Sequence, residues 1–180
     1  VDGVLFDSEP LHVQAWEKVF SRLGITLWES DYFAGVGVAD AEFLAGLKEA
    51  GRLPAGADIP EILREKEDAL LSIADGAAAI FPGVAEMVAG IANEYRLCAA
   101  SNSAGRFVRR MIETAGLSPF FACVVCATDG VRPKPAPDIY LRAAELRRRR
   151  AADRAAARPR GGRVRGGGRA PAARPAAVVA

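Results

Sequence analysis

Long apolar runs are missing from this sequence of 180 residues, and no basic segment followed by an apolar one opens it. A membrane span needs about 18 consecutive apolar residues, and an export signal needs that basic-then-apolar order. We therefore expect no contact with a membrane and a cytoplasmic location. Hydrophobic residues still make up 51% of the chain, enough to bury the core of one monomeric domain with a modest insertion.

Cysteine and histidine are also scarce. Three cysteines, an odd number, exclude a disulfide framework, and the single histidine, His12, leaves few ligands for zinc. Cys123 and Cys126 form a C-x-x-C pair, which could indicate a redox centre or half of a zinc site. However, the pair lies inside the apolar run 122–127, and the sequence has no second ligand pair. We therefore favour buried core thiols.

Negative charge is nearly absent from the end of the sequence. Residues 147–180 contain eleven arginines and one aspartate, whereas the preceding residues carry 13 Lys and Arg against 21 Asp and Glu. This segment uses six residue types and has no aromatic, leucine or isoleucine, which predicts a disordered tail. It could be a basic arm for nucleic acid or a frame-shifted translation of GC-rich DNA. We favour the frame shift because the change is abrupt, so nucleic acid is not an expected partner.

Residues 9–80 have the hydrophobic spacing of helices throughout. Apolar side chains recur at three- and four-residue intervals, and no alternating β pattern interrupts them. The first such stripe consists of Val13, Trp16, Phe20 and Leu23. The sequence therefore predicts an all-helical segment here.

From residue 81 onward, predicted helices alternate with short apolar strands at 97–100 and 123–127. Such alternation indicates βαβ units and hence an α/β protein with a parallel sheet. We also expect a strand at the start of the chain. The sheet domain would then comprise residues 1–8 and 81–146, and the helical segment would be inserted after the first strand.

Polar residues stand where the predicted strands end. Asp2 supplies an acid, the run Ser101–Ser103 supplies hydroxyls and backbone N–H groups at a helix start, and Lys134 supplies a cation between prolines. A phosphate group needs such a set, and open α/β sheets bind ligands beyond their strand ends. Each residue also has a plain alternative: the serines could cap the helix, Lys134 could be a solvated loop residue, and His12 could be packed or exposed.

Together these motifs resemble the haloacid dehalogenase (HAD) superfamily. The resemblance rests on D-G-V-L-F-D-S-E-P-L-H at Asp2–His12, S-N-S at Ser101–Ser103 and K-P-A-P-D-I-Y at Lys134–Tyr140. It covers about residues 1–146 and is closest to the branch that carries a small helical cap, with sugar-phosphate phosphatases and β-phosphoglucomutases. It implies a Rossmann-like core and identifies residues 9–80 as the cap.

The resemblance also implies roles for single residues. Asp2 would be the general acid/base and a ligand of the Mg²⁺ cofactor, and Ser101 and Lys134 would hold the transferring phosphoryl group. His12 and Asn102 are expected substrate contacts. In this family the phosphoryl group passes to an aspartate and is then hydrolysed.

Two parts of the family pattern have no match in the sequence. The nucleophilic aspartate would stand one position before Val1, and the fourth, acidic motif would lie beyond residue 146, where only Asp153 is found. We therefore expect a truncated chain that is inactive as it stands. The expected activity of the lineage is Mg²⁺-dependent hydrolysis of a small phosphate monoester, a sugar phosphate or similar metabolite.

A β-phosphoglucomutase-like phosphotransferase is the nearest alternative. Such proteins usually carry a cap arginine after a G-V-S-like turn, whereas the matching segment Gly35–Asp40 has Val38 at that place. This difference favours the phosphatase. A third possibility is a non-catalytic protein that binds nucleic acid through its basic tail.

Overall fold

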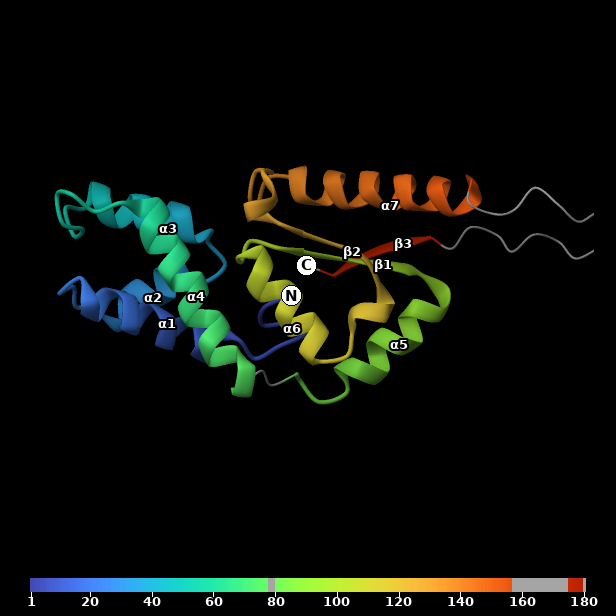
Figure 1. Ribbon diagram of the computed structural model, residues 1–180, viewed down its shortest axis with the longest axis horizontal. Helices are drawn as coiled ribbons and strands as arrows, with labels where there is room; N and C mark the ends of the chain where they lie inside the picture. Colours follow the sequence, from blue (N-terminus) through green and yellow to red (C-terminus); the bar gives the residue numbers. More distant parts are fainter. Residues whose placement is uncertain (78–79, 157–174, 180) are drawn as a thin grey trace, which may run out of the picture.

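A parallel β-sheet forms the centre of the α/β part of the chain. The computed structural model describes residues 1–77, 80–156 and 175–179. Its sheet contains β1 (Arg96–Ser101), β2 (Phe121–Cys126) and β3 (Ala176–Val179), in the order β2-β1-β3. Both β2 and β3 pair with β1 in parallel, which confirms the predicted sheet class and both internal strands (Figure 1).

Helices cover both faces of this sheet. Helix α7 (Asp138–Ala156) lies on one face, and α5 (Val84–Glu94) and α6 (Gly105–Thr114) lie on the other (Figure 1). Alternate residues of β1 serve the two faces, since successive side chains of a strand point in opposite directions. Leu97 and Ala99 join the core with α6, and Cys98 and Ala100 join the core under α7. Short 3₁₀ turns, η1 (Ser118–Phe120) and η2 (Ala127–Asp129), flank β2.

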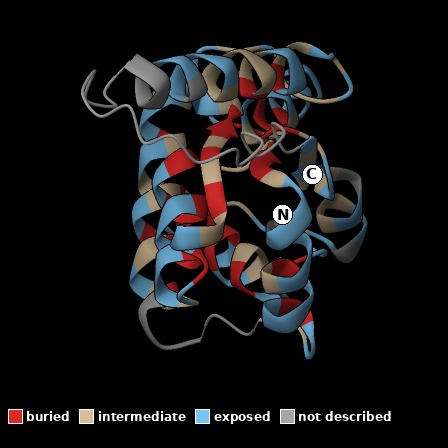
Figure 2. Cartoon of the chain, turned by 90° about the vertical axis from the view of Figure 1, so that its right-hand side faces the viewer, coloured by how far each residue is buried: buried red, intermediate tan, exposed pale blue. Residues whose placement is uncertain are grey.

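Four helices precede this unit and form a second cluster of buried side chains. They are α1 (Glu9–Arg22), α2 (Glu29–Gly35), α3 (Asp40–Glu49) and α4 (Ile59–Ala77). Their shared core contains Trp16, Val19, Phe20, Leu44, Leu47, Leu53 and Ile62. Buried residues gather on the strands and on the inward faces of helices, while the outward faces are exposed (Figure 2). The helical spacing is thus confirmed as far as Ala77.

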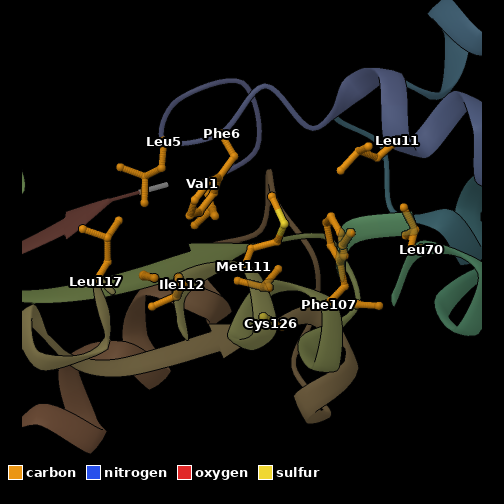
Figure 3. Packing of buried hydrophobic residues seen from close by; sticks show 14 of the residues in the cluster. Val1, Leu5, Phe6, Leu11, Leu70, Phe107, Met111, Ile112, Leu117 and Cys126 are labelled. Atoms are coloured by element: carbon orange, nitrogen blue, oxygen red, sulfur yellow. The ribbon is translucent and has the colours of Figure 1, made fainter. Parts of the chain in front are cut away.

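The expected strand at the start of the chain does not form. Gly3 adopts a positive φ of 65°, and Leu5 N–H donates to Val1 O at 2.8 Å, so the chain turns back at once. Phe6 makes isolated bridges with Asp2 and Ile80 in place of a ladder. The side chains of Val1, Leu5 and Phe6 instead pack on the α6 side of the sheet (Figure 3). Their apolar character reflects this packing and not a strand.

The expectation of disorder from residue 147 also differs from the structure. Helix α7 continues to Ala156, because its Arg and Ala residues are good helix formers. Ala176–Val179 form β3, which pairs with the β1 edge that the missing first strand leaves open. Residues 157–174 lie outside the described residues, and with them most of the basic segment. The nucleic-acid and frame-shift interpretations both stay untested predictions.

Candidate active site

Asp2 is the centre of a hydrogen-bonded group drawn from three parts of the chain. Ser8 Oγ donates to Asp2 Oδ1 at 2.8 Å. Ser101 Oγ and Ser103 Oγ donate to Asp2 Oδ2 at 2.8 and 2.9 Å. His12 Nε2 lies 3.6 Å from Asp2 Oδ1. The turn at Gly3, the start of α1 and the end of β1 therefore meet at one carboxylate.

The surroundings of Asp2 favour its charged form. Burial by itself would raise the pKa of this carboxyl group, but hydrogen bonds from His12, Ser8 and Ser101 and the nearby charge of His12 outweigh it. The pKa of Asp2 consequently lies far below its ordinary value of 3.8. In this arrangement Asp2 is a carboxylate at neutral pH and binds a proton only weakly.

The two serines are placed by the end of the central strand. Ser101 is the last residue of β1 and is buried, and its Oγ accepts a hydrogen bond from Ser103 N–H at 3.1 Å. Neither serine caps α6, whose N-cap residue is Ala104 without a side-chain bond. The first N–H groups of α6 are bound within the protein, Gly105 N–H to Thr128 Oγ1 and Arg106 N–H to Glu67 Oε1. The capping alternative is thus wrong, and the serine hydroxyls are directed at Asp2.

Asn102 holds the backbone of Lys134 next to the hydrogen-bonded group around Asp2. Its Oδ1 accepts from Lys134 N–H at 2.7 Å, and its Nδ2 donates to Lys134 O at 3.1 Å. The same Nδ2 also donates to Gly37 O at 3.1 Å, on the loop between α2 and α3. Among the described residues, no carboxylate lies within 4.0 Å of the Lys134 ammonium. The Asn102 side chain therefore binds backbone groups and positions the backbone of Lys134, whose side chain lines the cavity.

One cavity of about 990 Å³ brings together all five residues expected at the site: Asp2, His12, Ser101, Asn102 and Lys134. It lies between the α/β unit and the helices α1–α3, and its two sides differ in chemistry. The polar wall consists of Asp2, Ser101, Ser103 and Lys134. The apolar wall consists of Trp16, Tyr32, Phe33, Val36, Val38 and Phe43. Carboxylates beside cations and hydroxyls are typical of an active site for an anionic substrate.

Comparison with known proteins shows which family the chain belongs to. The family model for haloacid dehalogenase-like hydrolases matches residues 1–155. The chain belongs to this family. CbbY from Rhodobacter sphaeroides, solved in complex with phosphate, is a HAD neighbour that superimposes with a TM-score of 0.71 at 26% identity, over 81% of this chain and 69% of CbbY.

Two curated relatives extend this picture. The fructose-1-phosphate phosphatase YqaB of Escherichia coli is 26% identical over 145 residues, which cover 81% of this chain and 76% of YqaB. The Arabidopsis thaliana protein SUPPRESSOR OF QUENCHING 1, chloroplastic, is 34% identical over 151 residues, but the chain spans only 14% of that protein. The chain is therefore a member of the HAD-like hydrolase family that has a phosphatase among its relatives. No helix in the described part of the chain is long and apolar enough to cross a membrane.

Lys66 is a site residue that sequence reasoning missed. Its ammonium donates to Asp40 Oδ2 at 2.6 Å and contacts His12 Nδ1 at 2.8 Å, and it lies 4.9 Å from the centre of the Trp16 ring. The side chain is 1% exposed, and burial lowers its pKa against the opposing effect of Asp40. The contact of Lys66 with Nδ1 thus orients the His12 ring so that its other nitrogen, Nε2, faces Asp2. A lysine within the apolar stripe of α4 was the signal for this role.

Mg²⁺ is generally used by HAD hydrolases, and it prefers several oxygen ligands in near-octahedral geometry. In residues 1–77, 80–156 and 175–179, no group of three or more His, Cys, Asp or Glu side chains is placed to hold a metal. Both oxygens of Asp2 accept hydrogen bonds from serines. Asp2 therefore has no such group of ligands around it among the described residues, and its role as a metal ligand stays a prediction.

The cysteines lie in the core, as expected. All three are buried and free. Cys123 faces α7, with its Sγ 3.6 Å from Ala143 O, whereas Cys126 joins the core on the α6 side. The two members of the C-x-x-C pair thus point to opposite faces of the sheet, which rules out a shared redox or zinc site for them.

Proposed function

We propose that this chain binds a small phosphate monoester against its polar wall and belongs to a phosphatase of the HAD type. The observation that carries the proposal is the meeting of Asp2, two serine hydroxyls and the Lys134 ammonium beside one cavity, at the carboxyl ends of parallel strands. The fructose-1-phosphate phosphatase among the relatives supports this substrate class. A sugar phosphate or a similar small metabolite would fill the cavity.

A bound phosphate group would compete with Asp2 for the hydrogen bonds that the serine hydroxyls donate. Ser101 and Ser103 now donate to Asp2, and a phosphate oxygen held by Lys134 would take over these hydroxyls. Loss of donors and the arrival of negative charge both raise the pKa of a carboxyl group. Asp2 would then bind a proton, donate it to the leaving oxygen and afterwards accept one from water. His12, held by Lys66, would keep this carboxyl group oriented.

The helices α1–α4 would act as a cap over the reaction. They contribute the apolar wall, and Asn102 already joins their Gly37 carbonyl to the backbone of Lys134. A lid of this kind excludes water and brings specificity residues to the substrate. The substrate would enter when these helices move away from the polar wall.

The 180-residue chain would bind a phosphate ester but hydrolyse it slowly. The HAD mechanism needs a second carboxylate to accept the phosphoryl group, and within the described residues the hydrogen-bonded group around Asp2 contains none. Without covalent help, phosphate esters hydrolyse extremely slowly. Hydrolysis through an aspartyl-phosphate therefore remains a proposal for the lineage, and binding is what this chain would retain. Its cytoplasmic location and monomeric state also stay predictions.

Calorimetric titration of the intact chain with inorganic phosphate and fructose 1-phosphate tests the proposal. Both should bind at millimolar concentration or below, and replacing both Ser101 and Ser103 by alanine should weaken both about tenfold. Ser72→Ala, an exposed serine on α4, is the matched control. No binding of either ligand would overturn the proposal. Phosphate release assayed in parallel should be negligible, and rapid release would show that the inactivity expected of this chain is wrong.

The phosphomutase alternative is separated by its product. Formation of glucose 6-phosphate from β-glucose 1-phosphate would replace the phosphatase proposal. The likeness to a Clostridium difficile β-phosphoglucomutase, at 22% identity, concerns the fold alone. Val38, an aliphatic residue in the cavity lining, supplies no cation for a second phosphate.

A further inference from the structure

The apolar wall exposes large hydrophobic side chains to the cavity. Phe33 and Val36, which both line the cavity, are 70% and 54% exposed. Exposed apolar groups gathered at one place mark a surface that a ligand or partner covers. Because this surface faces the polar wall, the group that covers it is the organic part of whatever binds at Asp2 and Lys134.

Hydrogen-bonding groups are few on this wall. In the described lining, its side-chain hydrogen-bonding groups are the Tyr32 hydroxyl and the Trp16 indole N–H. The Asp40 carboxylate beside this wall already accepts from Lys66 through Oδ2. A ligand hydroxyl placed there gives up its bonds to water without recovering them, which weakens binding. An apolar ring gains from the same surface, and Trp16 and Phe43 offer aromatic contacts to it.

Charge in the cavity suits one phosphate and disfavours two. Of the described residues that line it, Lys134 is the single lysine or arginine, while Asp2, Glu9 and Asp40 are acidic. Two further cations lie nearby but are engaged: Lys66 with Asp40, and Arg52 with Asp31. A second phosphate against the apolar wall would face carboxylates without a cation to offset them.

We propose that the cavity selects monoesters with a single phosphate and a flat, apolar organic group, of which aryl phosphates are the simplest. This inference rests on the proposed function, because the polar wall must hold the phosphate. The apolar wall, which includes Phe33 and Phe43, takes the ring, and the ester oxygen points toward Asp2. Polyhydroxylated sugar phosphates and bisphosphates bind less well for the two reasons given above.

The test is calorimetric titration of the intact chain with methyl phosphate, phenyl phosphate, fructose 1-phosphate and fructose 1,6-bisphosphate. Phenyl phosphate should bind at least about tenfold tighter than methyl phosphate, and the two sugar phosphates no more than about threefold tighter. Sugar phosphates that bind as tightly as phenyl phosphate would overturn the inference and leave the proposed function standing. If no ligand binds, methyl phosphate included, the proposed function fails and the inference with it.

A variant of the apolar wall gives a second measurement. Phe33→Ser should lose about fivefold in affinity for phenyl phosphate and leave methyl phosphate unchanged, because the side chain is mostly exposed and adds little to folding. Leu141→Ser on α7, which is 65% exposed and outside this cavity, is the matched control. Equal losses for both ligands, or none for either, would contradict a ring-binding role of the apolar wall.

Discussion

The two walls of the cavity come from different parts of the chain and are built differently. The polar wall comes from the opening turn, the end of β1 and the loops that follow β1 and β2. Its serines, Ser101 and Ser103, bind Asp2 through hydrogen bonds of 2.8 and 2.9 Å. The apolar wall comes from α1, α2, α3 and the loop before α3, and its members Phe33 and Val36 are exposed.

This difference separates chemistry from recognition. Groups that handle a phosphate must stay within hydrogen-bond distance of fixed positions, so they sit on short loops held by a buried sheet. Groups that recognise the organic part of a substrate need only shape and apolar surface, so exposed members such as Phe33 and Val36 can vary without damage to the core. Substitutions in the polar wall should therefore weaken the binding of every phosphate ligand, whereas substitutions at exposed positions of the apolar wall should weaken only ligands with an apolar organic group.

Removal of the polar-wall cation should have the largest effect. Lys134→Ala takes away a charge-assisted bond to phosphate and should weaken every phosphate ligand about 100-fold, whatever its organic group. Calorimetry with inorganic phosphate measures this loss, and Lys48→Ala, at an exposed position on α3, is the control. A loss below about threefold would show that Lys134 does not hold the phosphate.

A change beneath the apolar wall should act on stability. Lys66→Met removes the ammonium that Asp40 and His12 share, and one partner of a buried pair is costly to lose. Because Asp40 is 23% exposed and can recover water, we expect a loss of about 2 kcal/mol in the free energy of unfolding. Urea denaturation followed by the fluorescence of Trp16 and Trp28 reports it. The double variant Lys66→Met/Asp40→Asn should recover part of the loss, and no recovery would contradict a coupled pair.

The polar wall was predictable from sequence because its residues stand next to strands. Ser101 ends β1 and Lys134 follows β2, and parallel strands bring such positions to one edge, where Asp2 joins them from the opening turn. The opening strand was predicted wrongly because Val1 and Leu5 are apolar for another reason, their packing on α6. Strand-like composition alone does not separate these two causes.

The apolar wall was not predictable in the same way. An aromatic residue in a helical stripe can face the core of its own segment, as Phe20 does, or a cavity, as Phe33 does, and both fit the same spacing. Lys66 shows the converse case, since its place in the apolar stripe reveals burial but not its partners. Pairings between distant helices depend on packing that no local pattern records.

The two walls are joined through Asn102, and its replacement should uncouple them. Asn102→Ala removes bonds to Lys134 and to Gly37, so Lys134 loses its fixed position and the α2–α3 loop loses its anchor. Phosphate affinity should fall about tenfold, and amide hydrogen exchange in the loop around Gly37 should quicken. Asn93→Ala on α5 is the control. Weaker phosphate binding with unchanged exchange near Gly37 would mean that Asn102 serves the polar wall alone.

The smallest expected effect concerns the acid stability that the polar wall confers. The folded-state pKa of Asp2 lies below its ordinary value of 3.8, so ionised Asp2 stabilises the fold above that pH, and the contribution is lost as the pH falls. Ser8→Ala removes the donor to Oδ1 and should reduce the difference in unfolding free energy between about pH 7 and about pH 1 by about 1 kcal/mol, because Asp2 of the folded chain takes up its proton only well below pH 3. Urea denaturation at both pH values measures it, with Ser72→Ala as control. An unchanged difference would mean that His12, Ser101 and Ser103 keep the pKa of Asp2 low without Ser8. The polar wall would then have more hydrogen-bond donors than the Asp2 carboxylate needs when no phosphate is bound.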